Sequence, residues 1–183
     1  MAIYDLENYE KLLAEAGEFH GDICGGIKTG TRMTMCGLRL LGIKDLKGED
    51  RKKLLVFVEI DRCATDAIMA LTGCRPGKRT MKIKDYGKMA ATFVDIESGK
   101  AVRVASARKK GKEVDHANAA DEELFHITPV NVLLKPEDLP GKPLRECQCA
   151  RCGETVLDGR EIEAAGETRC RPCSENEHYY RDL

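Results

Sequence analysis

A histidine and a cysteine lie four residues apart near the start of the chain, in the segment FHGDICGG at positions 19–26. Four residues make about one helical turn, so we expect His20 and Cys24 to lie on the same face of one helix. An imidazole and a thiolate are both good zinc ligands, and this pair would supply half of a tetrahedral site. The alternative is a histidine that is hydrogen-bonded to the backbone and a small buried thiol, which are both common.

A third candidate ligand, Cys63, follows an apolar segment that we predict to be a buried strand. Three protein ligands and an open fourth position are typical of a reactive zinc site, where the ion acts as a Lewis acid or lowers the pKa of bound water. Asp66 lies three residues further on and is the candidate catalytic residue, because it could orient a ligand or accept a proton from that water. The alternative for Asp66 is a carboxylate on a helix surface.

The carboxyl-terminal part contains two Cys-x-x-Cys pairs separated by 17 residues, a spacing expected of a structural zinc site. The candidate ligands are Cys149, Cys152, Cys170 and Cys173. Four thiolates leave no open position on the ion, and the metal would supply most of the folding free energy of so small a segment, on the order of 10 kcal/mol. Redox-active dithiols or simply buried cysteines are the alternatives for these pairs, and Cys147 could replace Cys149 as a ligand.

Composition restricts the class of protein. The chain has 183 residues, 42% of them hydrophobic, which is enough for one ordinary domain and a small appendage. Because 30 Lys and Arg balance 31 Asp and Glu, no overall field draws the chain to nucleic acid or to a membrane. We find no signal-peptide pattern and no apolar stretch of membrane-spanning length. We therefore expect a cytoplasmic protein whose nine cysteines are thiols and metal ligands rather than disulfides.

Apolar periodicity and turn residues predict the elements that must position these side chains. Helices are expected at 5–16 and 22–41, and a third, which Asp61 caps and Gly73 ends, at about 61–71. Strands are expected at 54–60, 80–84, 89–96, 100–107 and 128–134, with a short acidic helix at 121–125. This order favours an α+β fold with a helix-strand-helix-three-strand core and a mixed sheet.

Glycines and prolines mark two further features. Gly25, Gly26 and Gly30 leave one helix face without side chains, so another backbone or a ligand can approach it. Prolines and a glycine between residues 136 and 143 indicate a linker. We therefore expect a metal-binding domain at 1–135, a linker at 136–146 and a zinc finger of the ribbon or treble-clef type at 147–183.

Several motifs, taken in order, resemble the FmdE family of formylmethanofuran dehydrogenase proteins. They are FHGxxCxG from Phe19, CxxDA from Cys63, TGCxxGK from Thr72 and DYGK from Asp85. The resemblance covers most of residues 15–107, and the cysteine-rich tail is similar to the zinc-finger extension of many members. It implies a metal held by His20, Cys24 and Cys63, and a homodimer with interlocking elements.

The resemblance implies a zinc-binding accessory protein or subunit of the molybdenum- or tungsten-dependent enzyme, with an open metal site in the core and a structural zinc in the tail. Its partners would be a second copy, other subunits of such an enzyme and a small-molecule ligand at the core metal. One alternative is a free-standing zinc-dependent hydrolase or lyase with Asp66 as the base. Another is a zinc-ribbon module that binds nucleic acid or protein, which the balanced charge and few aromatic residues disfavour.

Overall fold

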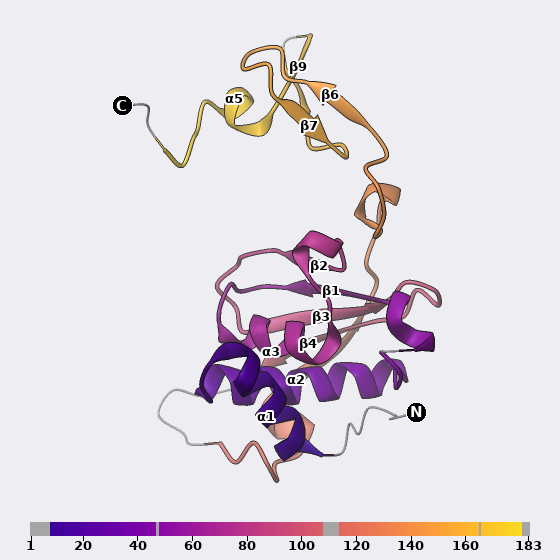
Figure 1. Cartoon of the computed structure of the whole chain (residues 1–183), viewed down its shortest axis with the longest axis vertical. Coiled ribbons are helices and arrows are strands. Elements are labelled where there is room, and N and C mark those ends of the chain that lie inside the picture. Colours follow the sequence, from indigo (N-terminus) through magenta and orange to yellow (C-terminus); the bar gives the residue numbers. More distant parts are fainter. Residues whose placement is uncertain (1–7, 47, 108–113, 165, 181–183) are drawn as a thin grey trace. The chain divides into compact units, whose positions relative to one another are not determined.

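The computed structural model describes residues 8–46, 48–107, 114–164 and 166–180. The chain divides into two compact units, Met1–Leu133 and Leu134–Leu183 (Figure 1). None of the helices in these described ranges is both long and apolar enough to cross a membrane.

The first unit is built on a five-stranded mixed sheet in the order β2-β1-β3-β4-β5 (Figure 1). Its strands are β1 (Leu54–Val58), β2 (Met81–Ile83), β3 (Ala90–Asp95), β4 (Ala101–Ser106) and β5 (Phe125–Val130). β1 and β2 are parallel and joined through a helix, whereas the remaining neighbours are antiparallel. The expected α+β fold with a mixed sheet is therefore confirmed.

Three helices of this unit position the candidate site, and a fourth is a single turn. They are α1 (Tyr9–His20), α2 (Gly25–Leu41), α3 (Cys63–Thr72) and α4 (Asp121–Leu124). The 3₁₀ turns η1 (Glu49–Lys52) and η2 (Pro76–Lys78) precede β1 and β2. α2 and α3 end at Gly42 and Gly73, which both adopt left-handed backbone conformations, as the sequence predicts.

The placement of His20 and Cys24 on one helix is wrong. α1 runs to His20 instead of ending at Ala16, and Gly21 then turns the chain with a φ of 101°. A new helix begins with Cys24 as its N-cap residue. Because glycine adopts this conformation without a steric penalty, the chain can end one helix and start the next within four residues. Residues 5–7 of the first expected helix lie outside the described ranges.

Two smaller expectations also differ from the structure. Arg62, rather than Asp61, is the N-cap residue of α3. The last strand begins at Phe125 rather than at residue 128, because Phe125 pairs with Ser106 at the end of β4 and the pairing runs from there to Val130. A pattern of side chains along one segment does not show how far its partner strand extends, so strand ends are decided by pairing.

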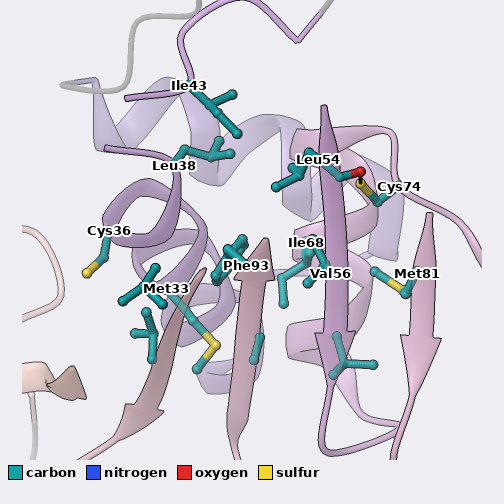
Figure 2. Packing of buried hydrophobic residues seen from close by; sticks show 14 of the residues in the cluster. Met33, Cys36, Leu38, Ile43, Leu54, Val56, Ile68, Cys74, Met81 and Phe93 are labelled. Carbon is teal, nitrogen blue, oxygen red and sulfur yellow. Dashed lines mark hydrogen bonds between the residues drawn. The ribbon is translucent and has the colours of Figure 1, made fainter. Parts of the chain in front are cut away.

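The core lies between the sheet and helices α2 and α3. Val56 of β1 pairs with Phe93 of β3, and both side chains are fully buried on the helix-facing side, close to Met33 and Ile68 (Figure 2). Gly37 of α2 lies directly over Phe93, since a Cβ atom there would come within 2.3 Å of the ring. Glycine at this position therefore lets the helix lie close to the sheet.

The second unit contains two short hairpins and one helical turn. Its elements are η3 (Pro136–Asp138), β6 (Glu146–Gln148), β7 (Thr155–Leu157), β8 (Ile162–Ala164), β9 (Glu167–Arg169) and α5 (Arg171–Glu175). β6 pairs with β7 and β8 pairs with β9, both antiparallel. Within the described part of this unit, the buried residues are Cys149, Asp158 and Cys173. Three-residue strands with so small a core cannot provide much hydrophobic stabilisation.

Candidate metal centre

The structure brings the three expected core donors together from three different elements. His20 is the last residue of α1, Cys24 caps α2, and Cys63 is the first residue of α3, after the end of β1. One ligand atom from each residue lies within 4.8 Å of the other two, and all three residues are only partly buried. Each of the three residues is therefore partly exposed to solvent.

Glycines allow the three elements to approach one another. A Cβ atom on Gly26 would lie 2.9 Å from Cβ of Cys63, and one on Gly30 would lie 2.7 Å from Cα of Ala64. Both distances are too short for a side chain, so only glycine lets the start of α3 pack against α2. The expected close approach is confirmed for these two positions, whereas a Cβ atom on Gly25 would have no neighbour within 4 Å.

Asp66 contacts the histidine of the group. Its Oδ2 lies 2.8 Å from Nδ1 of His20, and this hydrogen bond raises the pKa of His20. Asp66 and Cys63 lie three residues apart in the first turn of α3, so one helix terminus places both the sulfur and the carboxylate. The other ring nitrogen, Nε2, lies 3.6 Å from Oδ1 of Asp22. A metal on Nε2, with a carboxylate on Nδ1, would be the usual arrangement of a histidine ligand.

The two thiols of the group differ in their readiness to ionise. Burial opposes ionisation of Cys24, but its sulfur accepts the N–H of Ile27 at 3.5 Å, and this bond, the Cys63 thiol and the Gly26 N–H together lower its pKa. The interaction with the Cys24 sulfur, followed by burial, raises the pKa of Cys63. In the metal-free chain Cys24 is therefore the thiol that ionises first. A metal ion would favour the thiolate form of both.

The donor set fits zinc. Zinc–sulfur and zinc–nitrogen bonds are about 2.3 and 2.0 Å long, so donors on one tetrahedral ion lie roughly 3.5–4 Å apart, and the three donor atoms here lie within 4.8 Å of one another. Two thiolates and one imidazole are ligands that zinc prefers, and three protein ligands leave a fourth position free. Zinc held there would polarise a small molecule bound at that position.

The four expected tail cysteines also converge. Ligand atoms of Cys149, Cys152, Cys170 and Cys173 lie within 4.8 Å of one another. Backbone N–H groups of Cys152 and Cys170 lower the pKa of Cys149 to about 6, which favours the thiolate that binds metal.

Cys147 lies outside this cluster. Its thiol donates to the carbonyl of Val156 at 3.8 Å, across the hairpin of β6 and β7. The group of four converging cysteines does not include Cys147. Of the two possible first ligands, the structure therefore groups Cys149 with the other three.

A buried ion pair near α4 was missed by the sequence analysis. Arg32 donates to Asp121 Oδ1 at 2.9 Å and to the carbonyl of Ala119 at 2.8 Å, and Arg39 contacts the other carboxylate oxygen. Asp121 heads an acidic segment, which is typical of an ordinary exposed helix start. No spacing signal could have found the pair, because Arg32 and Asp121 lie 89 positions apart in the sequence.

Comparisons with known proteins agree with this fold. A family model described as FmdE, molybdenum formylmethanofuran dehydrogenase operon, matches residues 19–126, more than half of the chain. A solved structure of a tungsten formylmethanofuran dehydrogenase FmdE-like protein from Syntrophus aciditrophicus is 20% identical, with a TM-score of 0.58 over 98% of this chain and 100% of that one. At this identity the likeness shows a shared fold.

A curated relative adds sequence similarity. The "Probable S-adenosyl-L-methionine-binding protein" of Archaeoglobus fulgidus is 37% identical over 197 residues, which cover 85% of this chain and 53% of the relative. The chain thus spans about half the length of that protein. The family match includes His20, Cys24, Cys63 and Asp66 and most of the elements of the first unit. The chain belongs to the FmdE family.

Proposed function

We propose that the chain is a zinc-binding accessory protein or subunit associated with molybdenum- or tungsten-dependent formylmethanofuran dehydrogenase. His20, Cys24 and Cys63 would hold an open zinc site that takes a small ligand, and the four tail cysteines a structural zinc. The observation that carries the proposal is the meeting of an imidazole and two thiols, from α1, α2 and α3, within 4.8 Å. Membership of the FmdE family supports the association with the enzyme.

Asp66 would act as a positioning residue for His20 in this site. A carboxylate bound to Nδ1 keeps the proton on that nitrogen, which fixes the tautomer and the orientation of the imidazole ring. Since the 2.8 Å bond to His20 occupies Asp66 Oδ2, this carboxylate is less free to take a proton from water. That contact favours a ligand-binding role over the hydrolase or lyase alternative, in which Asp66 would be the base.

The tail would be a structural module with its zinc as the main source of folding free energy. Its four candidate ligands include two buried thiols, Cys149 and Cys173, and one exposed thiol, Cys152. Four thiolates would leave no open position, so this zinc would bind no substrate. We also propose that residues 136–146 link the two domains. The same proposal includes a homodimer and a cytoplasmic location.

Metal analysis of the reduced full chain tests the two sites separately. We expect two zinc ions per wild-type chain, one for each cluster, and one in Cys24→Ala, Cys63→Ala and Cys152→Ala. Cys147→Ala is the matched control, because its thiol lies outside both clusters, and it should keep two. An unchanged zinc content in both Cys24→Ala and Cys63→Ala would exclude the open site.

A second proposal is that the first unit binds S-adenosyl-L-methionine. It is supported by the 37% identity to the Archaeoglobus fulgidus protein, whose name states that ligand, although the chain spans about half of that protein. Equilibrium dialysis of the zinc-loaded chain against S-adenosyl-L-methionine, with adenosine as the control, tests it. Saturable binding of the sulfonium nucleoside at one site per chain would support this function, and equal retention of adenosine would contradict it.

A further inference from the structure

Cys24 and Cys63 form a close pair of thiols at the start of α2 and α3. Their sulfur atoms lie within 4.8 Å of each other, although 38 residues separate the two cysteines. Both are free and partly exposed, so a small solute can reach them. A disulfide needs a sulfur–sulfur distance of about 2.05 Å, so bond formation requires a combined movement of less than about 3 Å.

The backbone around both thiols can accommodate such a movement. Cys24 caps α2 and Cys63 is the first residue of α3, and the first turn of a helix lacks the hydrogen bonds that hold its interior. The missing side chain of Gly26 leaves the space that Cys63 occupies, since a Cβ atom there would be 2.9 Å from Cβ of Cys63. The absence of a side chain on Gly26 therefore lets Cys63 lie close to the start of α2, where Cys24 is the N-cap residue.

Apolar packing, rather than a metal, holds the helices that carry this pair. Cys24 and Cys63 pack against a buried cluster between α1, α2 and α3 that contains Leu12, Ile27 and Leu71. The tail differs, because its described part buries only Cys149, Asp158 and Cys173. The first unit can therefore stay folded while its thiols react. In the tail, oxidation of the cysteines would remove the metal ligands, and with them the main source of folding free energy of the tail.

We propose that Cys24 and Cys63 form a reversible disulfide that closes the core metal site to zinc under oxidation by a hydroperoxide. This inference rests on the proposed function, because the disulfide withdraws two of the three zinc donors. The device would make zinc occupancy of the core site depend on the redox state of the cell while the fold is retained.

The reaction balances with the peroxide as the two-electron oxidant. One thiolate attacks a peroxide oxygen, the O–O bond breaks, and a sulfenic acid and an alcohol or water form. The second thiol then attacks the sulfenic sulfur, the S–O bond breaks, and water leaves as the disulfide forms. Two equivalents of a small thiol reverse the reaction, and they are oxidised to their own disulfide as the two cysteines are reduced.

Peptide mapping of the full chain tests the proposal. The reduced protein, stripped of metal with a chelator, is treated with one equivalent of hydrogen peroxide and alkylated, and its peptides are separated without reductant. We expect a peptide pair linked through Cys24 and Cys63, about 2 Da lighter than the sum of the two reduced peptides, since a disulfide forms with loss of two hydrogens. The oxidised protein should take up one zinc ion fewer per chain, and dithiothreitol should restore it.

Two variants and a circular dichroism spectrum serve as controls for the peptide mapping. Cys63→Ser should give no link from Cys24, and Cys147→Ser, outside both clusters, should react as the wild type does. Circular dichroism should show that the oxidised chain keeps its helix content. Cross-links among the tail cysteines with Cys24 and Cys63 still reduced would overturn the proposal, as would oxidation of Cys24 to a sulfinic acid without a link. The zinc content of the reduced chain tests the proposed function on its own, because the linked peptide is scored by mass whether or not zinc binds.

Discussion

Asp66 Oδ2 lies 2.8 Å from Nδ1 of His20, so the first turn of α3 is joined to the last residue of α1 across 46 positions of sequence. The bond connects two elements that also supply two of the three core donors, and it engages only one of the two ring nitrogens of His20. A single carboxylate thus contributes to the packing of the helices and to the orientation of a candidate ligand.

Replacing this carboxylate should weaken zinc binding. We expect Asp66→Asn to lower the zinc affinity of the core site by about 10- to 100-fold, the usual effect of removing the partner of a histidine ligand. Competition with a chromophoric chelator in the reduced chain measures the change. Asp61→Asn, an exposed carboxylate that precedes the same helix, is the control and should bind as the wild type does. Equal affinities for the two variants would show that Asp66 does not position His20.

The same contact predicts a pH dependence in the metal-free chain. His20 has a pKa raised above the ordinary value of 6.5, first by the hydrogen bond to Asp66. A group whose pKa is raised on folding contributes stability that is complete below the unfolded pKa, so this contribution should be lost as the pH rises from 6.5 through the folded pKa. Nuclear magnetic resonance titration should place the pKa of His20 lower in Asp66→Asn than in the wild type. Identical titration curves would contradict this origin of the shift.

Zinc binding should show the opposite trend with pH. A proton competes with the metal for His20, so a raised pKa means that affinity begins to fall at a higher pH than for an ordinary histidine. We expect the core site to lose zinc before the tail cluster as the pH is lowered, because three protein ligands with an open fourth position would hold the ion less firmly than four thiolates. Zinc release followed with an indicator, in wild type and Cys63→Ala, assigns the early phase. The early phase should be missing from Cys63→Ala.

The close approach of α2 and α3 predicts a strong effect of one added methyl group. A Cβ atom on Gly30 would lie 2.7 Å from Cα of Ala64 and 2.8 Å from its carbonyl oxygen, and neither backbone atom can move away easily. We expect Gly30→Ala to lower the free energy of unfolding by about 1–3 kcal/mol, as overpacking does. Chemical denaturation measures it. Gly25→Ala is the matched control in the same helix, since its Cβ atom meets nothing within 4 Å, and it should be neutral or slightly stabilising.

The buried pair of Arg32 and Asp121 predicts a large loss when one partner is removed. Both side chains are nearly buried, 10% and 8% exposed, and Asp121 also contacts Arg39. We expect Asp121→Ala to destabilise the first unit by about 3–5 kcal/mol, because it leaves the Arg32 charge buried without its partner. Glu122→Ala, exposed in the same helical turn, should change the stability by less than about 0.5 kcal/mol. Similar losses for the two variants would show that the pair is not what holds α4 to α2.

Local patterns in the sequence account for much of this molecule. Two Cys-x-x-Cys pairs, a thiol after an apolar strand and a histidine near a thiol are visible without a structure, because ligand identity and short spacing are properties of the chain. The hairpin between β3 and β4 and the glycines that end α2 and α3 follow from turn chemistry for the same reason. Such features depend on residues close in sequence.

Contacts between distant parts of the chain could be assigned only from the tertiary structure. The prediction that His20 and Cys24 lie on one helix is wrong, because Gly21 ends α1 and the two residues come from different helices. The bond from Asp66 to His20 joins residues 46 positions apart, and the thiol of Cys147 contacts the carbonyl of Val156 instead of joining the tail donors. These outcomes depend on which faces the helices and strands bury against one another. Burial against a distant partner is a property of the whole fold, and periodicity along one segment does not contain it.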